Sequence, residues 1–312
     1  MIRSRAPVRI SLGGGGTDVS PYMERHGGIV LSTTIDRYAY CTVDESSKWI
    51  FESKFAEMAA RPFMHLSPAS VAHFTEAPAG SGLGGSSSLM VAIIKAFDAH
   101  FNGGEFLSPH QIAEQAYKVE RKDLGIVGGW QDQFAAAYGG WNLLDFSKDG
   151  TKVIRLDISE DTKRELLASL ILVDLGQTRL SSKILSRQIA TYNQERPEAM
   201  EALNKVKEIT RQMVVRLLVG DIEGLGLFLS EEWNEKKKLD SQISNHSIDK
   251  FHAGMLKRGA IGGKLLGAGS GGHMVFIADL SERKSLLTHV EDTGFKHIPF
   301  NFDSQGVVAW KT

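Results

Sequence analysis

Alternating apolar and polar residues in the first fifty positions predict a chain that begins with strands. Four runs fit the two-residue period of a half-buried strand, and turn-forming or charged residues separate them: residues 8–12, 28–35, 37–45 and 49–53. We therefore expect four early strands connected by turns. Cys41, in the third of these runs, is interpreted as a small buried side chain rather than a reactive thiol.

A helical period takes over before residue 90. Apolar residues then recur with the i, i+3, i+4, i+7 and i+8 spacing of one helix face: Leu89, Ala92, Ile93, Ala96 and Phe97. A second helix starts with Ser108 as its N-cap and Pro109 at its first position, and we expect it to close near Gly125. Residues 141–146 and 152–158 have the pattern of a returning pair of strands.

Beyond residue 160 the pattern changes to long helices. Residues 169–176 form an apolar run typical of a buried strand, and helical tracts dominate residues 181–234. A further helix over residues 247–258 leads into a glycine loop and another strand. We therefore expect an α+β architecture in two domains: residues 1–160 and 161–312.

Composition narrows the function classes. The 312 residues carry a formal net charge of −1, which gives no electrostatic reason to expect nucleic acid or an anionic membrane as a partner. No apolar run reaches membrane-spanning length, and the N-terminus lacks the apolar core of a signal peptide. The single cysteine excludes an internal disulfide and fits a reducing compartment, so we expect a cytoplasmic protein. The sequence leaves the oligomeric state open, a homodimer included.

Glycines gather at a few points of the chain. Of the 32 glycines, four stand at 13–16, four lie between 80 and 85, and several fall between 259 and 272. The second group comes directly before the helix of Leu89, and three serines at the start of that helix supply hydroxyl groups. A helix N-terminus offers free backbone N–H groups and a partial positive charge, so this loop is interpreted as a phosphate site rather than a flexible connection.

Comparison of the loop with known phosphate-binding motifs excludes several kinds of site. The loop contains G-x-G-x-x-G at Gly80, Gly82 and Gly85, but a second helix follows where a dinucleotide fold needs a strand. The chain has no G-x-x-x-x-G-K-[ST] motif, and the H-R-D and D-F-G elements of protein kinases are missing. No pair of the ten histidines has the spacing of a zinc site. A dehydrogenase is therefore disfavoured.

Three motifs in order resemble those of the GHMP kinases, the superfamily of galactokinase, homoserine kinase and mevalonate kinase. Residues 6–18, "APVRISLGGGGTD", resemble the first motif, "PAGSGLGGSSS" the second, and residues 262–272, "GGKLLGAGSGG", the third. The resemblance implies a two-domain fold with a ribosomal protein S5 domain 2-like N-terminal half and a ferredoxin-like C-terminal half. Its first motif is most similar to that of the D-glycero-D-manno-heptose 7-phosphate kinases.

The resemblance implies an ATP site with Mg²⁺ in the cleft between the halves. The residues that would bind the triphosphate are Gly80, Ser81, Gly82, Leu83, Gly84, Gly85, Ser86, Ser87, Gly267, Ala268, Gly269 and Ser270. Ser86 and Glu120 match the family's magnesium ligands. For Glu120 the alternative is a solvated helix carboxylate, and for the loop at residues 267–270 it is a plain turn.

Catalytic and sugar-binding residues are implied in the same way. Asp132, in "GGWQDQF", matches the catalytic base, and Arg9 matches an active-site arginine that would stabilise the transferred phosphoryl group. Asp18 matches the carboxylate that holds sugar hydroxyls, next to Gly15, Gly16 and Thr17. A buried pairing for structure alone is the alternative for Arg9 and Asp18.

Substitutions within the first motif bear on the sugar. Galactokinases carry a Glu-His pair where this chain has Gly15 and Gly16, and a tyrosine where it has Val19, which disfavours galactose. The expected reaction is phosphorylation of heptose 7-phosphate at O1, to the 1,7-bisphosphate of nucleotide-activated heptose synthesis. Fucose, galactose and N-acetylhexosamine 1-kinases are alternatives, and a non-catalytic sugar sensor is a further one, disfavoured because Asp132, Glu120 and Arg9 are all present.

A second anion site is predicted after the buried strand of residues 169–176. Arg179, Ser181, Ser182 and Lys183 place two cations and two hydroxyls at the start of a helix. We interpret them as the site of a sugar's terminal phosphate. The alternative is an ordinary capped surface helix.

Overall fold

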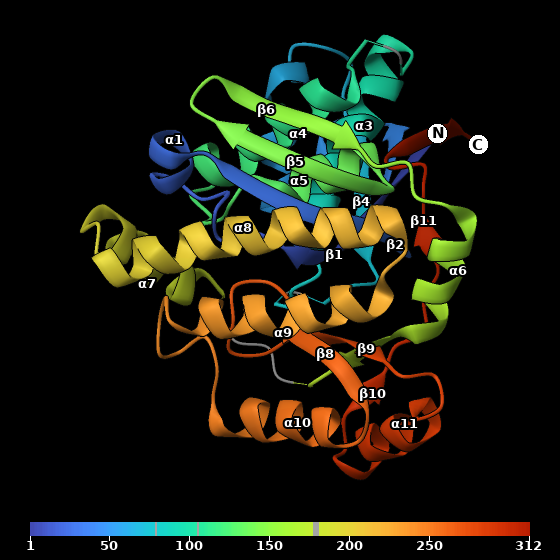
Figure 1. The fold of residues 1–312 in the computed structure, drawn as a ribbon. Helices are drawn as coiled ribbons and strands as arrows, with labels where there is room; N and C mark the ends of the chain where they lie inside the picture. The colour runs from blue at the N-terminus through green and yellow to red at the C-terminus, as the bar shows by residue number, and fades with distance from the viewer. Residues whose placement is uncertain (79, 105, 177–180) are drawn as a thin grey trace.

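Two sheets with helices around them form the molecule (Figure 1). The computed structural model describes residues 1–78, 80–104, 106–176 and 181–312, and of residues 181–183 it describes the backbone alone. Within these ranges no helix is long and apolar enough to cross a membrane.

The larger sheet is built mainly from the first half of the chain. Its strands are β1 (Ile2–Gly13), β2 (Gly28–Glu45), β3 (Ile50–Phe51), β4 (Ala69–Thr75), β5 (Trp141–Ser147), β6 (Gly150–Arg155), β11 (Phe302–Asp303) and β12 (Val308–Lys311). The order is β12-β1-β2-β4-β3, with β5 and β11 pairing β2 and β6 pairing β5. All pairs are antiparallel except β3 with β4.

The two early runs at 28–35 and 37–45 form one strand, so the turn expected between them is absent. The register against β1 shifts there, because Val8 faces Ile35 whereas Pro7 faces Tyr38. Asp36 and Arg37 are the extra residues of a β-bulge, which interrupts pairing without ending the strand. Both bind the segment before β11: Asp36 receives the backbone N–H of Asn301, and Arg37 donates to the Pro299 carbonyl.

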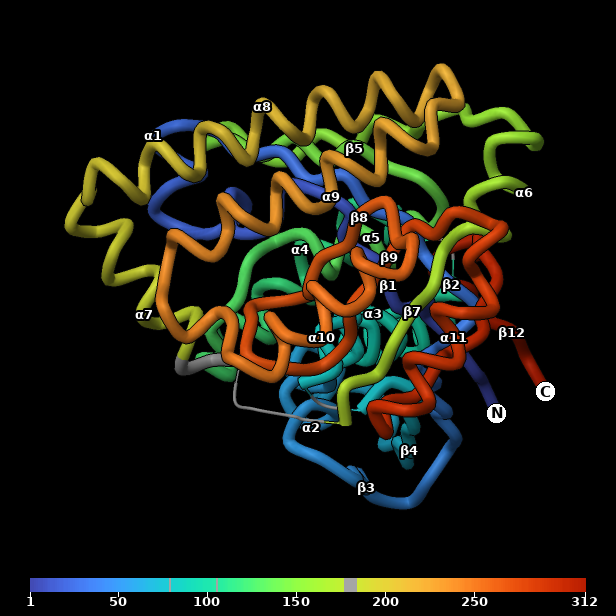
Figure 2. The backbone as a smooth tube through the Cα atoms, turned by 60° about the horizontal axis from the view of Figure 1, so that its bottom comes forward, coloured from blue at the N-terminus to red at the C-terminus, as the bar shows by residue number. Residues whose placement is uncertain are grey.

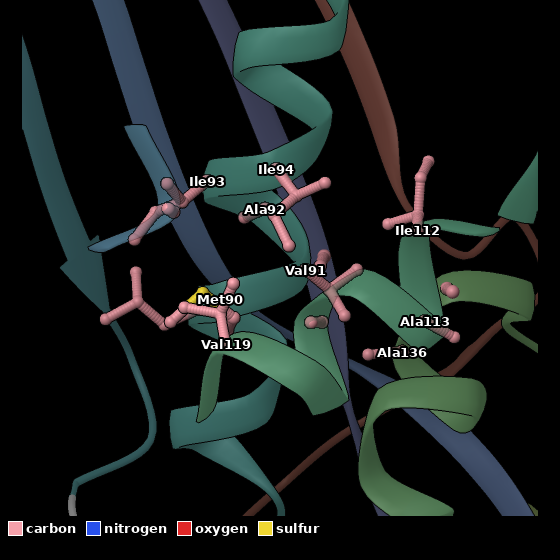
Figure 3. Packing of buried hydrophobic residues seen from close by; sticks show 14 of the residues in the cluster. Met90, Val91, Ala92, Ile93, Ile94, Ile112, Ala113, Val119 and Ala136 are labelled. Carbon is pink, nitrogen blue, oxygen red and sulfur yellow. The ribbon is translucent and has the colours of Figure 1, made fainter. Parts of the chain in front are cut away.

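Helices α3 (Gly85–Asn102) and α5 (Gln131–Tyr138) pack on this sheet, and α4 (Pro109–Tyr117) packs on both of them. Apolar side chains of α3 meet those of its neighbours, Ile112, Ala113 and Ala136 among them (Figure 3). The predicted start of α4 is confirmed: Ser108 and Gln111 form a capping box with Pro109 at the first position. A turn of π-helix (Lys118–Asp123) follows α4 and carries Glu120. Three short helices also belong to this half: α1 (Tyr22–His26), α2 (Lys54–Ala60) and a 3₁₀ helix (Arg61–Phe63).

The second half is built around a smaller antiparallel sheet in the order β10-β7-β9-β8. Its strands are β7 (Leu170–Asp174), β8 (Ala260–Leu265), β9 (His273–Ala278) and β10 (Lys296–His297). Strand β7 is buried along most of its length, which confirms the buried strand predicted there. The helices of this half are α6 (Glu160–Ser169), α7 (Ser181–Asn193), α8 (Pro197–Val219), α9 (Ile222–Lys237), α10 (His246–Lys257) and α11 (Arg283–Asp292).

Helices α8 and α9 join the halves. They lie side by side across the molecule, α8 against β1 and β2 and α9 against β8 and β9 (Figures 1 and 2). The last strands, β11 and β12, return to the larger sheet, and β12 pairs with β1 so that the two ends of the chain lie together. The boundary expected at residue 160 stays a prediction, and the final residues belong to the sheet of the first half.

Candidate active site

A cavity of about 450 Å³ lies between the two halves. The first half contributes β1 and the loop after it, the glycine loop before α3, the π-helical turn and the start of α5. The second half contributes α7, α9, β8 and the loop after β8. The predicted site residues that line it are Arg9, Gly15, Gly16, Asp18, Gly80, Ser81, Gly82, Gly84, Gly85, Ser86, Ser87, Glu120, Asp132, Gly267 and Ala268.

Arg9 and Asp132 form an ion pair on the wall of this cavity. Strand β1 carries Arg9, and its Nη2 and Nε lie 2.6 and 2.9 Å from Oδ1 of Asp132. Asp132 stands in the first turn of α5, where the free N–H groups favour a negative charge. The Nη1 of Arg9 also donates to the Gly82 carbonyl. The arginine therefore fixes the carboxylate against the glycine loop, and the carboxylate keeps partial access to solvent.

Asp18 holds the start of α5 in place. Its Oδ2 accepts the backbone N–H of Gln131, and its Oδ1 accepts the Gln131 side chain and the N–H of Gly16, all at 3.1 Å. Burial raises the pKa of Asp18, the hydrogen bond from Gln131 lowers it, and the charge of Asp132 raises it further. A Cβ on Gly129 would lie 2.0 Å from Oδ2, so only glycine lets this carboxylate approach. Asp18 thus positions Asp132 and also faces the cavity.

The glycine loop before α3 needs its glycines. Gly80, Gly82 and Gly84 all have φ near +77°, the left-handed region that favours glycine. A Cβ on Gly82 would lie 2.5 Å from the Leu266 carbonyl oxygen, so this loop and the loop after β8 meet backbone to backbone. His273 in β9 binds the Ser81 carbonyl through both its backbone N–H and Nδ1, at 3.0 and 2.8 Å. The first turn of α3 therefore opens into the cavity from a fixed loop.

A hydrogen-bonded cluster surrounds Glu120. The hydroxyls of Ser86 and Ser87 donate to its two carboxylate oxygens at 2.6 and 2.7 Å, and Nε2 of Gln133 donates at 2.7 Å. Nη1 of Arg121 lies 3.2 Å from Oε1. Glu120 has no exposed surface, so the alternative of a solvated helix carboxylate is wrong. Ser88, the third serine, donates to the Pro7 carbonyl and is not available to a ligand.

The loop after β8 divides into two parts. Gly267 and Ala268 line the cavity, whereas Gly269 and Ser270 do not. Ser270 donates its hydroxyl to the Gln242 carbonyl and its N–H to the Ile243 carbonyl, both at 2.8 Å. A Cβ on Gly269 would lie 2.8 Å from Cα of Ile243. Both residues thus join the loop to the segment between α9 and α10, and their predicted contact with phosphate stays a prediction.

Comparison with known proteins places this site in a family. Residues 50–140 match the family model of the GHMP kinases N terminal domain, and residues 196–296 match that of the GHMP kinases C terminal. Together the matches take up more than half of the chain. The chain belongs to the GHMP kinase family. Its members are kinases that use ATP, and the resemblance seen in the three motifs is confirmed.

Similar proteins support the same family over the whole length. The chain is 32% identical to the D-glycero-alpha-D-manno-heptose 7-phosphate kinase of Campylobacter jejuni, over 99% of both chains. The crystal structure of a D-glycero-D-manno-heptose 1-phosphate kinase from Bacteroides thetaiotaomicron has a TM-score of 0.82 at 29% identity, covering 100% of this chain and 99% of that chain. A phosphomevalonate kinase of Streptococcus pneumoniae, at 16% identity and a TM-score of 0.79, covers 97% and 100% and shares the fold. The expected two-domain GHMP kinase fold is confirmed.

Some expected GHMP kinase site residues lie elsewhere. Thr17 is fully buried and donates its hydroxyl to the carbonyls of Gly14 and Ile29, which closes the loop after β1. Leu83 places its side chain in the core, and its carbonyl accepts the Arg9 N–H. The terminal-phosphate site predicted at Arg179, Ser181, Ser182 and Lys183 stays a prediction. Arg179 and the side chains of residues 181–183 lie outside the described residues.

Several side chains of the cavity wall were given no role from the sequence: Ser11, Gln131 and Lys264, which lie within the quoted motifs, and Lys236, which lies outside them. Lys236 stands in the charged run "EEWNEKKKLD", for which no functional role was expected. The helical spacing of apolar residues contained the signal that Lys236 is buried. Leu225, Leu229, Trp233 and Lys236 lie on one face of α9, and all four are buried.

Proposed function

We propose that this GHMP kinase is an ATP-dependent sugar 1-kinase whose substrate is D-glycero-D-manno-heptose 7-phosphate, which it converts to the 1,7-bisphosphate. The observation that carries the kinase reaction is the Arg9–Asp132 pair, held against the Gly82 carbonyl of the glycine loop. A carboxylate beside a phosphate-binding helix end is placed to accept a proton from a sugar hydroxyl. The similarity to a heptose 7-phosphate kinase over 99% of both chains supports the substrate.

The proposed reaction uses these residues in fixed roles. Asp132 accepts the proton of O1, an anomeric hydroxyl that is more acidic than an ordinary alcohol. The O1 oxygen bonds to the γ-phosphorus, and the bond from that phosphorus to the bridging oxygen of ADP breaks, its electron pair leaving with ADP. Arg9 orients Asp132 and supplies positive charge near the transferred group. The free N–H groups at the start of α3 bind the phosphates.

Ser86 and Glu120 fit a magnesium ion. Their oxygens lie 2.6 Å apart at the start of α3, and both residues line the cavity. A hard cation prefers such oxygen ligands and completes its shell with water and substrate phosphates. This fits the absence, among the described residues, of any cluster of three side chains able to hold a metal alone. The ion would neutralise charge on the triphosphate.

Replacing Glu120 by glutamine is expected to raise the Mg²⁺ concentration for half-maximal activity by about tenfold to a hundredfold, since the variant keeps the shape but loses the charge of the ligand. The measurement is a titration of activity against Mg²⁺ at saturating ATP. Glu114→Gln, at an exposed position of α4, is the matched control and should leave the titration unchanged. An unchanged titration in Glu120→Gln would remove this residue from the metal site.

The choice of sugar rests on the pocket beside Asp18. Gly15 and Gly16 line the cavity without side chains, so the sugar side is open where a galactokinase carries larger residues. Leu185 and Gln188, both on α7, also line it. The terminal phosphate is proposed to bind at the start of the same helix, through Arg179 with Ser181, Ser182 or Lys183.

Arg179→Ala is expected to raise KM for the phosphorylated sugar by about tenfold to a hundredfold, because a charge-assisted hydrogen bond is worth about 1.5–3 kcal/mol. KM for ATP should change little. Arg164→Ala, which removes an exposed arginine paired with Asp161, is the control and should change neither constant. Equal damage to both constants in Arg179→Ala would indicate a folding or closure role instead.

A panel assay tests the substrate. ADP release is measured with hexoses, heptoses and their 1- and 7-phosphates (6-phosphates for the hexoses), because the names of the two similar heptose kinases differ in the position of the phosphate. We expect the highest kcat/KM with D-glycero-D-manno-heptose 7-phosphate. A higher value with fucose, galactose, an N-acetylhexosamine or a heptose 1-phosphate would overturn the proposed substrate.

A further inference from the structure

Lys236 is a buried cation that has no carboxylate partner in the part of the chain that the structure describes. Its side chain projects from α9 into the cavity wall, and the residue is 4% exposed. Its Nζ donates to the Gly267 carbonyl at 2.8 Å and forms no ion pair with a described residue. The neighbouring Lys264 differs, because its Nζ lies 2.7 Å from Oε2 of Glu232 and 3.1 Å from the Leu12 carbonyl. An ammonium group has three donors, so Lys236 has capacity for a ligand.

Polar atoms surround the position that a side chain on Gly15 would occupy. A Cβ at that position would lie 3.4 Å from Nζ of Lys236, 3.6 Å from Oγ of Ser11 and 3.7 Å from Nε2 of Gln131. Oγ of Ser11 and Oε1 of Gln131 are buried without a hydrogen-bond partner among the described residues. Buried polar groups are normally hydrogen-bonded, so this group of atoms is arranged for something that enters the cavity.

The loops on either side show where this space lies in the proposed reaction. Gly267, which accepts from Lys236, contacts Gly82 of the glycine loop, and Gly82 accepts from Arg9, the partner of Asp132. Lys236 and Arg9 therefore approach the cavity from opposite halves of the molecule. Both cations thus line the cavity beside the two loops, where a phosphoryl group would move to a hydroxyl beside Asp132.

We propose that Lys236 is a catalytic residue whose ammonium group binds the phosphoryl group during its transfer from ATP to the sugar, with Ser11 and Gln131 contacting the sugar hydroxyls above Gly15. The inference rests on the proposed kinase reaction but not on which sugar is used. Because Asp132 offsets part of the charge of Arg9, a second cation would add positive charge at the transferred group. Lys236 makes no bond in the reaction and stays charged throughout.

The charge state of Lys236 gives the inference a pH signature. Burial lowers the pKa of Lys236 to about 8, and the nearby Lys264 on β8 lowers it as well. Glu232 on α9 and Asp18 in the loop after β1 raise it, and Arg9 on β1 lowers it. The ammonium form is present below this pKa, so kcat/KM of the free enzyme should fall as the pH rises through about 8.

The test replaces Lys236 by methionine, which keeps the length of the side chain and removes the charge. We expect kcat to fall about a hundredfold, with KM for the sugar changed by no more than about threefold and the fall of kcat/KM near pH 8 lost. Lys238→Met is the matched control: Lys238 lies two residues further along, is half exposed and pairs with Glu235 on the surface. It should keep the wild-type kcat and pH profile.

A second variant, Gly15→Ala, tests the same inference if Lys236→Met folds poorly. Gly15→Ala adds a methyl group at ordinary contact distance and outside the left-handed region, so it fills the space while leaving the ammonium group in place. We expect it to lower kcat/KM for the sugar at least tenfold. A Lys236→Met enzyme within fivefold of the wild-type kcat, a loss confined to KM for the sugar, or a retained fall near pH 8 would each overturn the inference. If wild type proves active only on another sugar, the proposed substrate fails, and the same variants are tested with that sugar.

Discussion

Replacing Asp132 by asparagine is expected to lower kcat by about 10²–10⁴, the usual contribution of a positioned general base. The asparagine oxygen can still accept from Arg9, so the ion pair becomes a hydrogen bond and the loop contact through Gly82 is kept. The amide cannot take the proton of O1, however. The loss should therefore fall on kcat, and binding of ATP should change little.

Steady-state kinetics together with ATP binding by calorimetry measure this effect. Asp161→Asn is the control, because Asp161 is exposed on α6 and does not line the cavity. Wild-type turnover in Asp132→Asn would exclude Asp132 as the base. A loss of less than about tenfold would leave it only the role of orienting the hydroxyl, as a dissociative transfer allows.

Gly82→Ala is expected to lower kcat/KM for ATP by at least about a hundredfold. Gly82 has φ +77°, and its new Cβ would lie 2.5 Å from the Leu266 carbonyl oxygen and 2.9 Å from the carbon. Backbone cannot yield as a side chain does, so the glycine loop and the loop after β8 must move apart. A misplacement of about 1 Å at a reacting centre is enough for a loss of about 10².

Gly103→Ala separates this effect from backbone strain. Gly103 ends α3 with φ +79°, nearly the conformation of Gly82, but a Cβ there meets nothing within 4 Å. The control should thus lose about 1 kcal/mol of unfolding free energy for the left-handed alanine and keep full activity. Equal kinetic damage in the two variants, or none in Gly82→Ala, would contradict the close packing of the two loops as a requirement of the site.

Local chemistry explains why much of this site could be predicted from sequence. A left-handed backbone next to a helix start favours glycine, so the spacing of Gly80, Gly82 and Gly84 in the sequence predicts the loop that they form. Likewise the capping box needs only Ser108 and Gln111, which are three positions apart in the sequence, and no distant partner. The motif resemblance then placed Arg9 and Asp132 in one site, and the structure brings them together at 2.6 Å.

Features that depend on distant partners were not predictable in this way. Strand β2 continues through Asp36 because the segment around Asn301 supplies hydrogen bonds there, a partner 265 residues away. Ser270 turns from the cavity because the Ile243 carbonyl accepts its N–H. Lys236 is one of three consecutive lysines in the sequence, and the packing of α9 on the smaller sheet buries it.

The position of the new phosphate tests the central claim most directly. Wild-type enzyme, ATP, Mg²⁺ and D-glycero-D-manno-heptose 7-phosphate are allowed to react, and phosphorus NMR follows the product while ADP is counted in parallel. The account predicts one sugar phosphate for each ADP, with the new phosphorus coupled to the anomeric proton, and almost no product from Asp132→Asn. A phosphate on any other carbon, or ADP released without a new sugar phosphate, would contradict it.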